Sequence, residues 1–121
     1  MTRFSDPTEL ARAFVDRIND HDVDGLVGMM TDDHVFIDAL GSKTVGRTAM
    51  REAWQSYFEA FPDYEIVVKG IDDCGEAALV TGHARASFAG DDDERDPWET
   101  PGTWTAVIRD GLIGEWRVER D

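Results

Sequence analysis

The spacing of apolar residues changes along the chain from a helical step to a strand step, and this change restricts the fold more than any other feature. Before residue 64 apolar residues recur every three or four positions, as in Leu10, Phe14 and Ile18. From Tyr64 onward they alternate with polar residues, which is typical of strands with one buried face. The sequence therefore predicts helices followed by an antiparallel sheet, an α+β fold.

Three helices are expected, over residues 7–21, 23–30 and 48–61. The first two follow Asp6 and Asp22, which are suitable N-cap residues, and Pro7 fits the first helical position. The third carries an aromatic face on helical spacing and should end before a proline: Trp54, Tyr57, Phe58 and Phe61-Pro62.

Five strands are expected, one before the third helix and four after it. Asp110-Gly111 predicts a tight hairpin between the last two. A single long polar loop is expected over residues 90–99, and whether it closes a cavity stays open at this point. With 121 residues, one domain over residues 1–121 is expected. The five strands are placed at residues 34–39, 64–69, 77–88, 100–109 and 112–119.

The charge of the chain excludes some partners. It has 26 acids and 12 bases, a formal net charge of −14, so nucleic acid is not expected as a partner. A carboxylate excess with almost no lysine resembles proteins of salt-loving archaea. No apolar run is long enough to span a membrane and no secretory leader is recognisable, so a cytoplasmic protein without membrane contact is expected.

Neither metal nor cofactor is expected. The single cysteine, Cys74, has no ligand at metal spacing and is expected to be a buried thiol. The acidic run at residues 91–94 has no spaced ligand pattern and is expected to be a solvated loop.

One carboxylate stands out against its neighbours. Asp38 follows the apolar run Val35-Phe36-Ile37, and alternation places it on the same face as Phe36. An unpaired charge removed from water costs several kcal/mol, so Asp38 either points to solvent or has a use within the fold.

The segment around Asp38 resembles ketosteroid isomerases and SnoaL-like polyketide cyclases of the nuclear transport factor 2-like superfamily. The resemblance rests on the element order and on residues 30–47, with Phe36-Ile37-Asp38-Ala39-Leu40-Gly41 and then Gly46-Arg47 before a helix. It implies a cystatin-like roll, in which three helices pack in a strongly curved antiparallel sheet that forms a cone with an apolar pocket. It also implies a homodimer, and it places Asp38 on the general base.

The resemblance also marks departures. Phe14 occupies the position of the family's oxyanion tyrosine and has no proton to donate. Trp104 and Trp54 occupy the positions of the protonated acid and of a supporting tyrosine. Three readings stay open: an indole N–H holds Asp38 ionised, an indole N–H stabilises a substrate oxyanion, or both tryptophans fill the core.

A histidine is a further candidate. His83 is placed on the face of its strand that it shares with Leu79 and Thr81, and this face is expected to point toward the cavity, where a histidine moves protons or positions a ligand. The alternative is a partly exposed strand histidine. The complete set of predicted pocket-lining residues is Phe14, Phe36, Trp54, Leu79, Trp104, Trp116 and Val118.

Two functions follow from these residues. In the first, Asp38 acts as a cofactor-independent general base on a small hydrophobic carbonyl compound, catalysing isomerisation or cyclisation, with Trp54, Trp104 and His83 as further catalytic candidates. In the second, the chain is a non-catalytic ligand-binding or dimerisation module of the same fold. Loss of turnover in an Asp38→Asn variant distinguishes the first function from the second.

Overall fold

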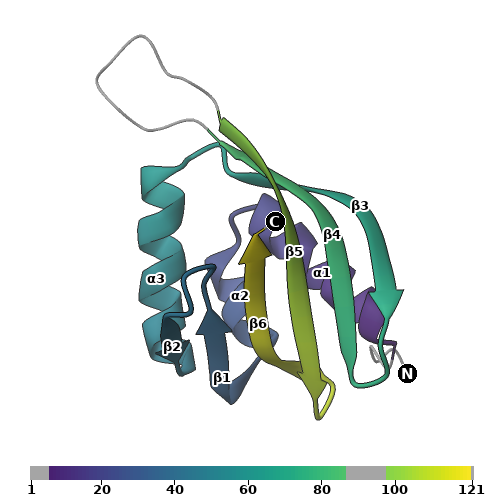
Figure 1. Ribbon diagram of the computed structural model, residues 1–121. Coiled ribbons are helices and arrows are strands. Elements are labelled where there is room, and N and C mark those ends of the chain that lie inside the picture. Colours follow the sequence, from purple (N-terminus) through teal and green to yellow (C-terminus); the bar gives the residue numbers. More distant parts are fainter. Residues whose placement is uncertain (1–5, 87–97, 121) are drawn as a thin grey trace, which may run out of the picture.

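A computed structural model describes residues 6–86 and 98–120 of the chain, with the side chains of Trp98 and Arg120 excepted. Within these ranges the chain forms three helices and six strands in an α+β arrangement, the class that the apolar spacing predicts (Figure 1). The elements run in the order α1 (Pro7–Asn19), α2 (Val23–Gly28), β1 (Met30–Ile37), β2 (Lys43–Val45), α3 (Arg47–Ala60), β3 (Glu65–Asp73), β4 (Ala77–Ala86), β5 (Trp98–Arg109) and β6 (Leu112–Arg120).

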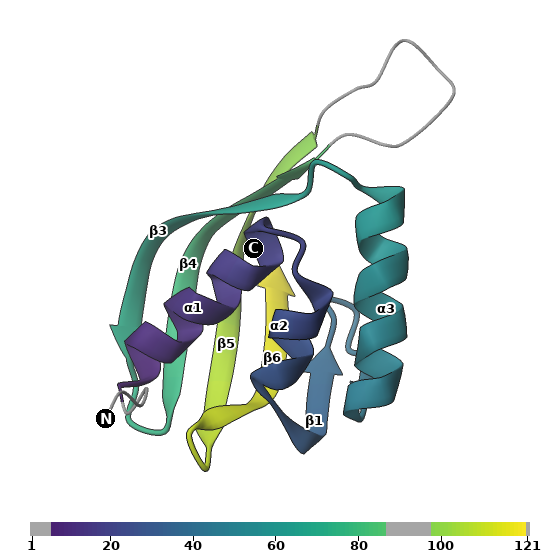
Figure 2. The ribbon, with the colours of Figure 1, turned by 180° about the vertical axis from the view of Figure 1, so that it is seen from behind.

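The six strands form one curved sheet in the order β2-β1-β6-β5-β4-β3. The helices cover its concave side, with α1 lying across β3 to β5 and α3 beside β1 and β2 (Figure 2). The curved sheet is confirmed, and four of its five strand pairs are antiparallel. The pair β1–β6 is parallel; these strands come from distant parts of the chain, so no hairpin requires them to run antiparallel.

A bulge contributes to the curvature. The register of β3 against β4 shifts between Val68 and Gly70, where the backbone of β3 comes very close to Gly82. A Cβ atom built on Gly82 would lie 2.0 Å from the carbonyl oxygen of Val67, so only glycine fits there.

The predicted N-cap residues cap their helices, and the predicted apolar stripe and hairpin are present. The Asp6 side chain accepts a hydrogen bond from the Thr8 amide, and Asp22 accepts one from Gly25. On α1, Leu10, Phe14 and Ile18 are at most 1% exposed and form the stripe that packs on the sheet. The hairpin between β5 and β6 turns at Asp110-Gly111, where both residues have positive φ.

Several boundaries differ from the sequence predictions. The first strand begins at Met30 and ends at Ile37, so Asp38 lies in a turn and not in the strand. The short strand β2 was not predicted, because three mixed residues carry no periodic signal. The predicted loop over residues 90–99 and its acidic run fall mostly on residues outside the described ranges, although β5 already begins at Trp98.

Cys74 is exposed, so the expectation of a buried thiol is wrong. It lies in the turn between β3 and β4, where a side chain has no inner face to occupy. Among the described residues no helix is long and apolar enough to cross a membrane.

Candidate functional site

Two adjoining cavities lie between the concave face of the sheet and the helix α3. The larger has a volume of about 550 Å³ and the smaller about 310 Å³. They share four lining residues, Tyr57, Tyr64, Trp104 and Val118, so one elongated ligand can extend from one into the other.

The small cavity contains most of the predicted pocket. Its aromatic wall comes from β1, α3, β5 and β6, because inward-facing positions on these neighbouring elements meet at this end of the sheet. Six residues of the sequence-predicted site line it: Phe36, Asp38, Trp54, Trp104, Trp116 and Val118. Met50, Ala53, Tyr57 and Tyr64 complete the wall.

Asp38 is half-buried at the edge of the small cavity. Its Oδ1 atom accepts hydrogen bonds from the backbone amides of Leu40 and Ser42, each at 2.9 Å. Its backbone also closes the turn, since the Gly41 amide donates to the Asp38 carbonyl oxygen. The second carboxylate oxygen, Oδ2, makes no hydrogen bond to the described residues. The turn therefore fixes the carboxylate through one oxygen and leaves the other available.

The structure contradicts the reading in which an indole holds Asp38 ionised. Backbone amides occupy Asp38 Oδ1, and the Trp54 indole nitrogen is buried without a hydrogen-bond partner among the described residues. Trp54 instead packs against other rings, with centroid distances of 5.2 Å to Phe58 and 6.2 Å to Phe36. The Trp54 side chain lines the small cavity, while its indole nitrogen is a buried donor without an acceptor among the described residues.

Three predicted site residues do not line either cavity. Phe14 is fully buried against Trp116, with ring centroids 4.8 Å apart, so it belongs to the core beneath the pocket. Leu79 and His83 do share one face of β4, but that face points away from the cavities, because the buried residues of β4 are the alternate ones, from Ala78 to Ala86. The expected orientation of Leu79 and His83 toward the pocket is therefore wrong.

His83 has a different partner on the outer face. Its Nε2 atom lies 2.6 Å from the Glu99 carboxylate on the neighbouring strand β5. The interaction is partly exposed, and the alternative of a partly exposed strand histidine describes it.

Two tyrosines that line the cavities were not predicted as site residues from the sequence. Tyr57 on α3 and Tyr64 just before β3 line both cavities, and their rings meet edge to face at 4.8 Å. Tyr57 was assigned only to the buried face of its helix. The available signal was its position one turn after Trp54, which places both side chains on the same side of α3.

A second histidine, His34, lies on the inner face of β1. It is 0% exposed, and its Nδ1 atom donates to the carbonyl oxygen of Ile113 at 2.8 Å. Burial lowers the pKa of His34 below the ordinary histidine value. Since His34 lines neither of the two cavities, we assign it to the core and not to the site.

The site contains no group of metal ligands. Among the described residues, no three His, Cys, Asp or Glu side chains come together in a way that could hold an ion. The polar groups that line the cavities are carboxylates, with Asp38 at the small cavity and Glu99 and Glu119 at the large one, together with indole N–H groups and hydroxyl groups.

A curved sheet that encloses a pocket with three helices defines an α+β protein of the cystatin-like class. Residues 11–116 match the family model of the SnoaL-like domain, and the chain belongs to this family. A search of the curated proteins found no match.

Solved structures agree on the fold. An uncharacterised cystatin-fold protein from Novosphingobium aromaticivorans is 20% identical with a TM-score of 0.83, over 95% of this chain and 98% of that one. A candidate SnoaL-like polyketide cyclase from Shewanella denitrificans is 18% identical with a TM-score of 0.84, over 93% and 88%. TerC, co-crystallised with polyporic acid, is 15% identical with a TM-score of 0.77, over 93% and 89%. At these identities the likeness concerns the fold alone.

Proposed function

We propose that this SnoaL-like domain binds a flat, mostly apolar carbonyl compound and uses Asp38 as a general base on it. The observation that carries the proposal is the position of Asp38 at the edge of an aromatic cavity, with one oxygen fixed by two amides and the other unoccupied by described residues. A fixed carboxylate beside an apolar surface can take a proton from carbon without first reorganising.

In the proposed reaction, Asp38 removes a proton from the carbon next to a ligand carbonyl. The C–H bonding electrons move into an enolate, and the carbonyl oxygen gains the negative charge. For isomerisation, Asp38 returns the proton to another carbon. For cyclisation, the enolate carbon attacks a second carbonyl of the same molecule, and the alkoxide formed there takes the proton back from Asp38. The unpartnered Trp54 indole N–H is the proposed donor to the developing oxyanion.

The test uses the isomerisation of 3-cyclohexen-1-one to 2-cyclohexen-1-one, followed by absorbance of the conjugated product. We expect Asp38→Asn to lower kcat/KM about a hundredfold or more, as loss of a general base does. The fold should persist, because the asparagine oxygen can still accept the Leu40 and Ser42 amides. Comparable rates in the two proteins would exclude Asp38 as the base.

Asp73→Asn is the matched control for this substitution. The Asp73 Oδ1 atom also accepts a turn amide, that of Gly75, at 2.9 Å. Asp73 lines neither of the two cavities, so its variant removes the same charge without touching the proposed base. We expect its activity and melting temperature to stay close to those of the unmodified protein.

A second function is favoured by the core position of Phe14 and by the turn bonds of Asp38. A non-catalytic ligand-binding module needs no oxyanion donor at Phe14, and the two amide bonds alone give Asp38 a structural role. In that case the unmodified protein binds apolar carbonyl compounds and releases them unchanged. Recovery of intact ligand after long incubation, with no isomerised product, supports this function.

The homodimer implied by the family resemblance also stays a proposal. Thr103, Thr105 and Val107 are half-buried on the outer side of β5, whereas Trp104 and Ala106 are buried on its inner side. A dimer through the outer face would double the molar mass measured by light scattering, and the mass of a single chain would exclude it.

The high-salt habitat proposed from the net charge of −14 predicts a melting temperature that rises with salt.

A further inference from the structure

The turn after α1 contains a histidine in a backbone conformation that favours glycine. His21 has a φ of 56°, in the left-handed region that non-glycine residues seldom adopt. Its amide donates to the Ile18 carbonyl oxygen at 3.0 Å, and the Asp22 amide donates to the Arg17 carbonyl oxygen at 2.9 Å. These two hydrogen bonds form the Schellman motif, whose left-handed position is usually glycine. A side chain held there at a conformational cost indicates contacts that offset the cost.

Two contacts of the His21 ring lead toward the candidate site. The ring stacks on Phe58 of α3, with centroids 4.2 Å apart and an interplanar angle of 3°. The Nε2 atom of His21 donates to the carbonyl oxygen of Tyr64 at 2.9 Å. Neither His21 nor Phe58 lines either of the two cavities, so the histidine supports their walls from behind.

The first contact continues into the wall of the small cavity. Phe58 stacks in turn on Trp54, with centroids 5.2 Å apart and an interplanar angle of 28°. The Trp54 side chain lines the small cavity, and its indole nitrogen has no hydrogen-bond partner among the described residues. Since no hydrogen bond within the described chain fixes the direction of this N–H, the packing of neighbouring rings on Trp54 determines it.

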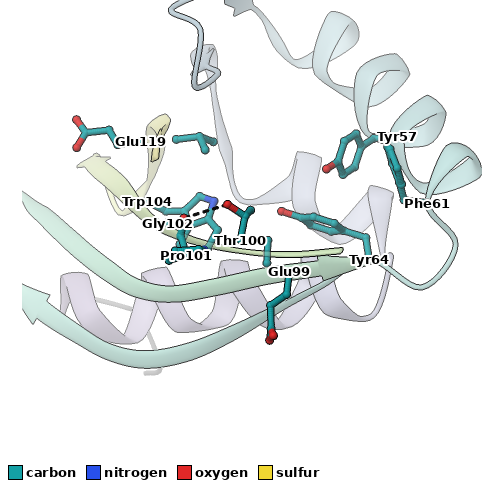
Figure 3. Close-up of a pocket in the computed structure, with 11 residues that line it drawn as sticks. Tyr57, Phe61, Tyr64, Glu99, Thr100, Pro101, Gly102, Trp104 and Glu119 are labelled. Carbon is teal, nitrogen blue, oxygen red and sulfur yellow. Dashed lines mark hydrogen bonds between the residues drawn. The ribbon is translucent and has the colours of Figure 1, made fainter. Parts of the chain in front are cut away.

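The second contact acts on the wall that the two cavities share. Figure 3 shows the ring of Tyr64 extending into the large cavity from the segment between α3 and β3. Two residues further on, the Asn19 side chain exchanges two hydrogen bonds with the backbone of Ile66, at 2.8 and 3.0 Å. The end of α1 therefore anchors the start of β3 at two points, and the bond from His21 acts on Tyr64 itself.

We propose that His21 is a positioning residue for the candidate site, because it orients Trp54 through Phe58 and holds Tyr64 through its carbonyl oxygen. The inference rests on the proposed function, since it concerns the oxyanion donor of the same site. A histidine that only ended α1 would be replaced by glycine without loss, because glycine adopts the left-handed conformation freely. The variant His21→Gly therefore separates a positioning role from a purely structural one.

The first measurement needs no ligand. It is the exchange of the Trp54 indole N–H with solvent, followed by NMR and assigned with the Trp54→Phe variant. We expect His21→Gly to speed this exchange about tenfold or more, because the stack no longer restrains the indole ring. The melting temperature should fall by no more than about 5 °C, since relief of the backbone strain offsets part of the lost contacts. Exchange of the Trp116 indole should not change, because that ring packs on Phe14.

Two further variants separate the ring from the backbone. His21→Asn tolerates the left-handed conformation but carries no ring, so it should speed the Trp54 exchange as His21→Gly does. It also provides the same test if His21→Gly does not fold. His21→Phe keeps a ring to stack on Phe58 and should leave the Trp54 exchange within about threefold of that of the unmodified protein.

The second measurement is turnover of 3-cyclohexen-1-one. Under the proposed function, His21→Gly should lower kcat about tenfold or more, because a misplaced donor stabilises the transition state less. KM should change by no more than about threefold, since the residues that line the cavities are all retained.

Asp110→Gly is the matched control. Asp110 is the other non-glycine residue with positive φ in the part of the chain that the structure describes, at 54°. It lies in the hairpin between β5 and β6 and lines neither of the two cavities. Its variant relieves the same kind of backbone strain away from the site, so the Trp54 exchange and kcat should stay at the values of the unmodified protein.

Three results would overturn the inference. They are an unchanged Trp54 exchange in the His21→Gly and His21→Asn variants, an equal acceleration at Trp116, and an equal acceleration in Asp110→Gly. Exchange in His21→Phe as fast as in His21→Gly would contradict the role of the stack on Phe58. Absence of turnover in the unmodified protein contradicts the base mechanism at Asp38 alone, because the exchange measurement tests His21 without a ligand.

Discussion

Histidines on the two faces of the sheet differ in burial and in their hydrogen-bond partners. His34, on the inner face of β1, is fully buried, and its Nδ1 atom donates to the backbone carbonyl of Ile113. His83, on the outer face of β4, is partly exposed and pairs with the carboxylate of Glu99. The two histidines differ in environment because strand alternation assigns each to one face, and not because of their immediate neighbours in the sequence.

The groups available for chemistry in this protein lie mainly on the concave side of the sheet. The concave side of the sheet and the helix α3 gather three tryptophans, two tyrosines and one carboxylate around the cavities: Trp54, Trp104, Trp116, Tyr57, Tyr64 and Asp38. The outer face carries threonines and exposed ion pairs such as Arg85 with Glu65. A charged residue on the outer face is solvated by water, whereas a polar group on the inner face requires a hydrogen-bond partner within the protein or a ligand.

The largest difference is expected between neighbouring residues on β5. Trp104 is 3% exposed and lines both cavities, so Trp104→Ala should lower the free energy of unfolding by about 3 to 5 kcal/mol. Thr103→Ala, on the outer face, should change it by no more than about 0.5 kcal/mol. Urea denaturation of the two variants measures both values. Similar losses would mean that the faces are not as different as their burial indicates.

A smaller, pH-dependent difference is expected for His34. Its pKa is lowered in the folded state, so between that value and about 6.5 the unfolded chain binds a proton that the folded chain does not. Stability should therefore fall as the pH decreases below about 6.5, and His34 should have no such effect above it. His34→Asn removes the titrating group while keeping a donor for the Ile113 carbonyl.

The measurement for His34 is the free energy of unfolding of both proteins between about pH 5 and pH 8. The carboxylates contribute equally to both, so the difference between the two curves isolates His34. If the two curves run parallel through this pH range, the protonation of His34 is not linked to folding.

The smallest effect is expected on the outer face at Glu65. Its carboxylate accepts from Arg85 on the neighbouring strand at 2.8 Å, but both side chains are about half exposed. Glu65→Gln should lower the free energy of unfolding by less than about 1 kcal/mol. In about 1 M salt the difference should vanish, since screening acts on exposed charges. A loss of several kcal/mol that persists in salt would place this pair among the interactions of the core.

Much of the fold could be predicted, because its signals are local. Asp6 and Asp22 cap their helices through their own side chains, and Asp110-Gly111 turns through its own backbone angles. The strand β2 and the parallel pairing of β1 with β6 could not be predicted in this way. The first is too short for a period, and the second depends on the path of the whole chain between residues 37 and 112.

The site was predicted less completely than the fold. The alternation of residues along β4 correctly placed His83 and Leu79 on one face of the strand. It could not show which face of β4 lies on the concave side of the sheet. The partner of Asp38 proved to be its own turn, which forms only when Gly41 adopts a positive φ. Tyr57 and Tyr64 could not be recognised as one polar group, because a helix and a strand bring them together.

The sequence by itself determined the class of fold, the helix caps and the last hairpin, because each depends on interactions within a few residues. Only the tertiary structure decided which face of the sheet encloses the cavities, that His34 is buried and His83 is not, and that Tyr57 and Tyr64 meet at the wall of both cavities. The curvature of the sheet is the physical reason, since it is a property of all six strands together and brings distant residues to one concave side.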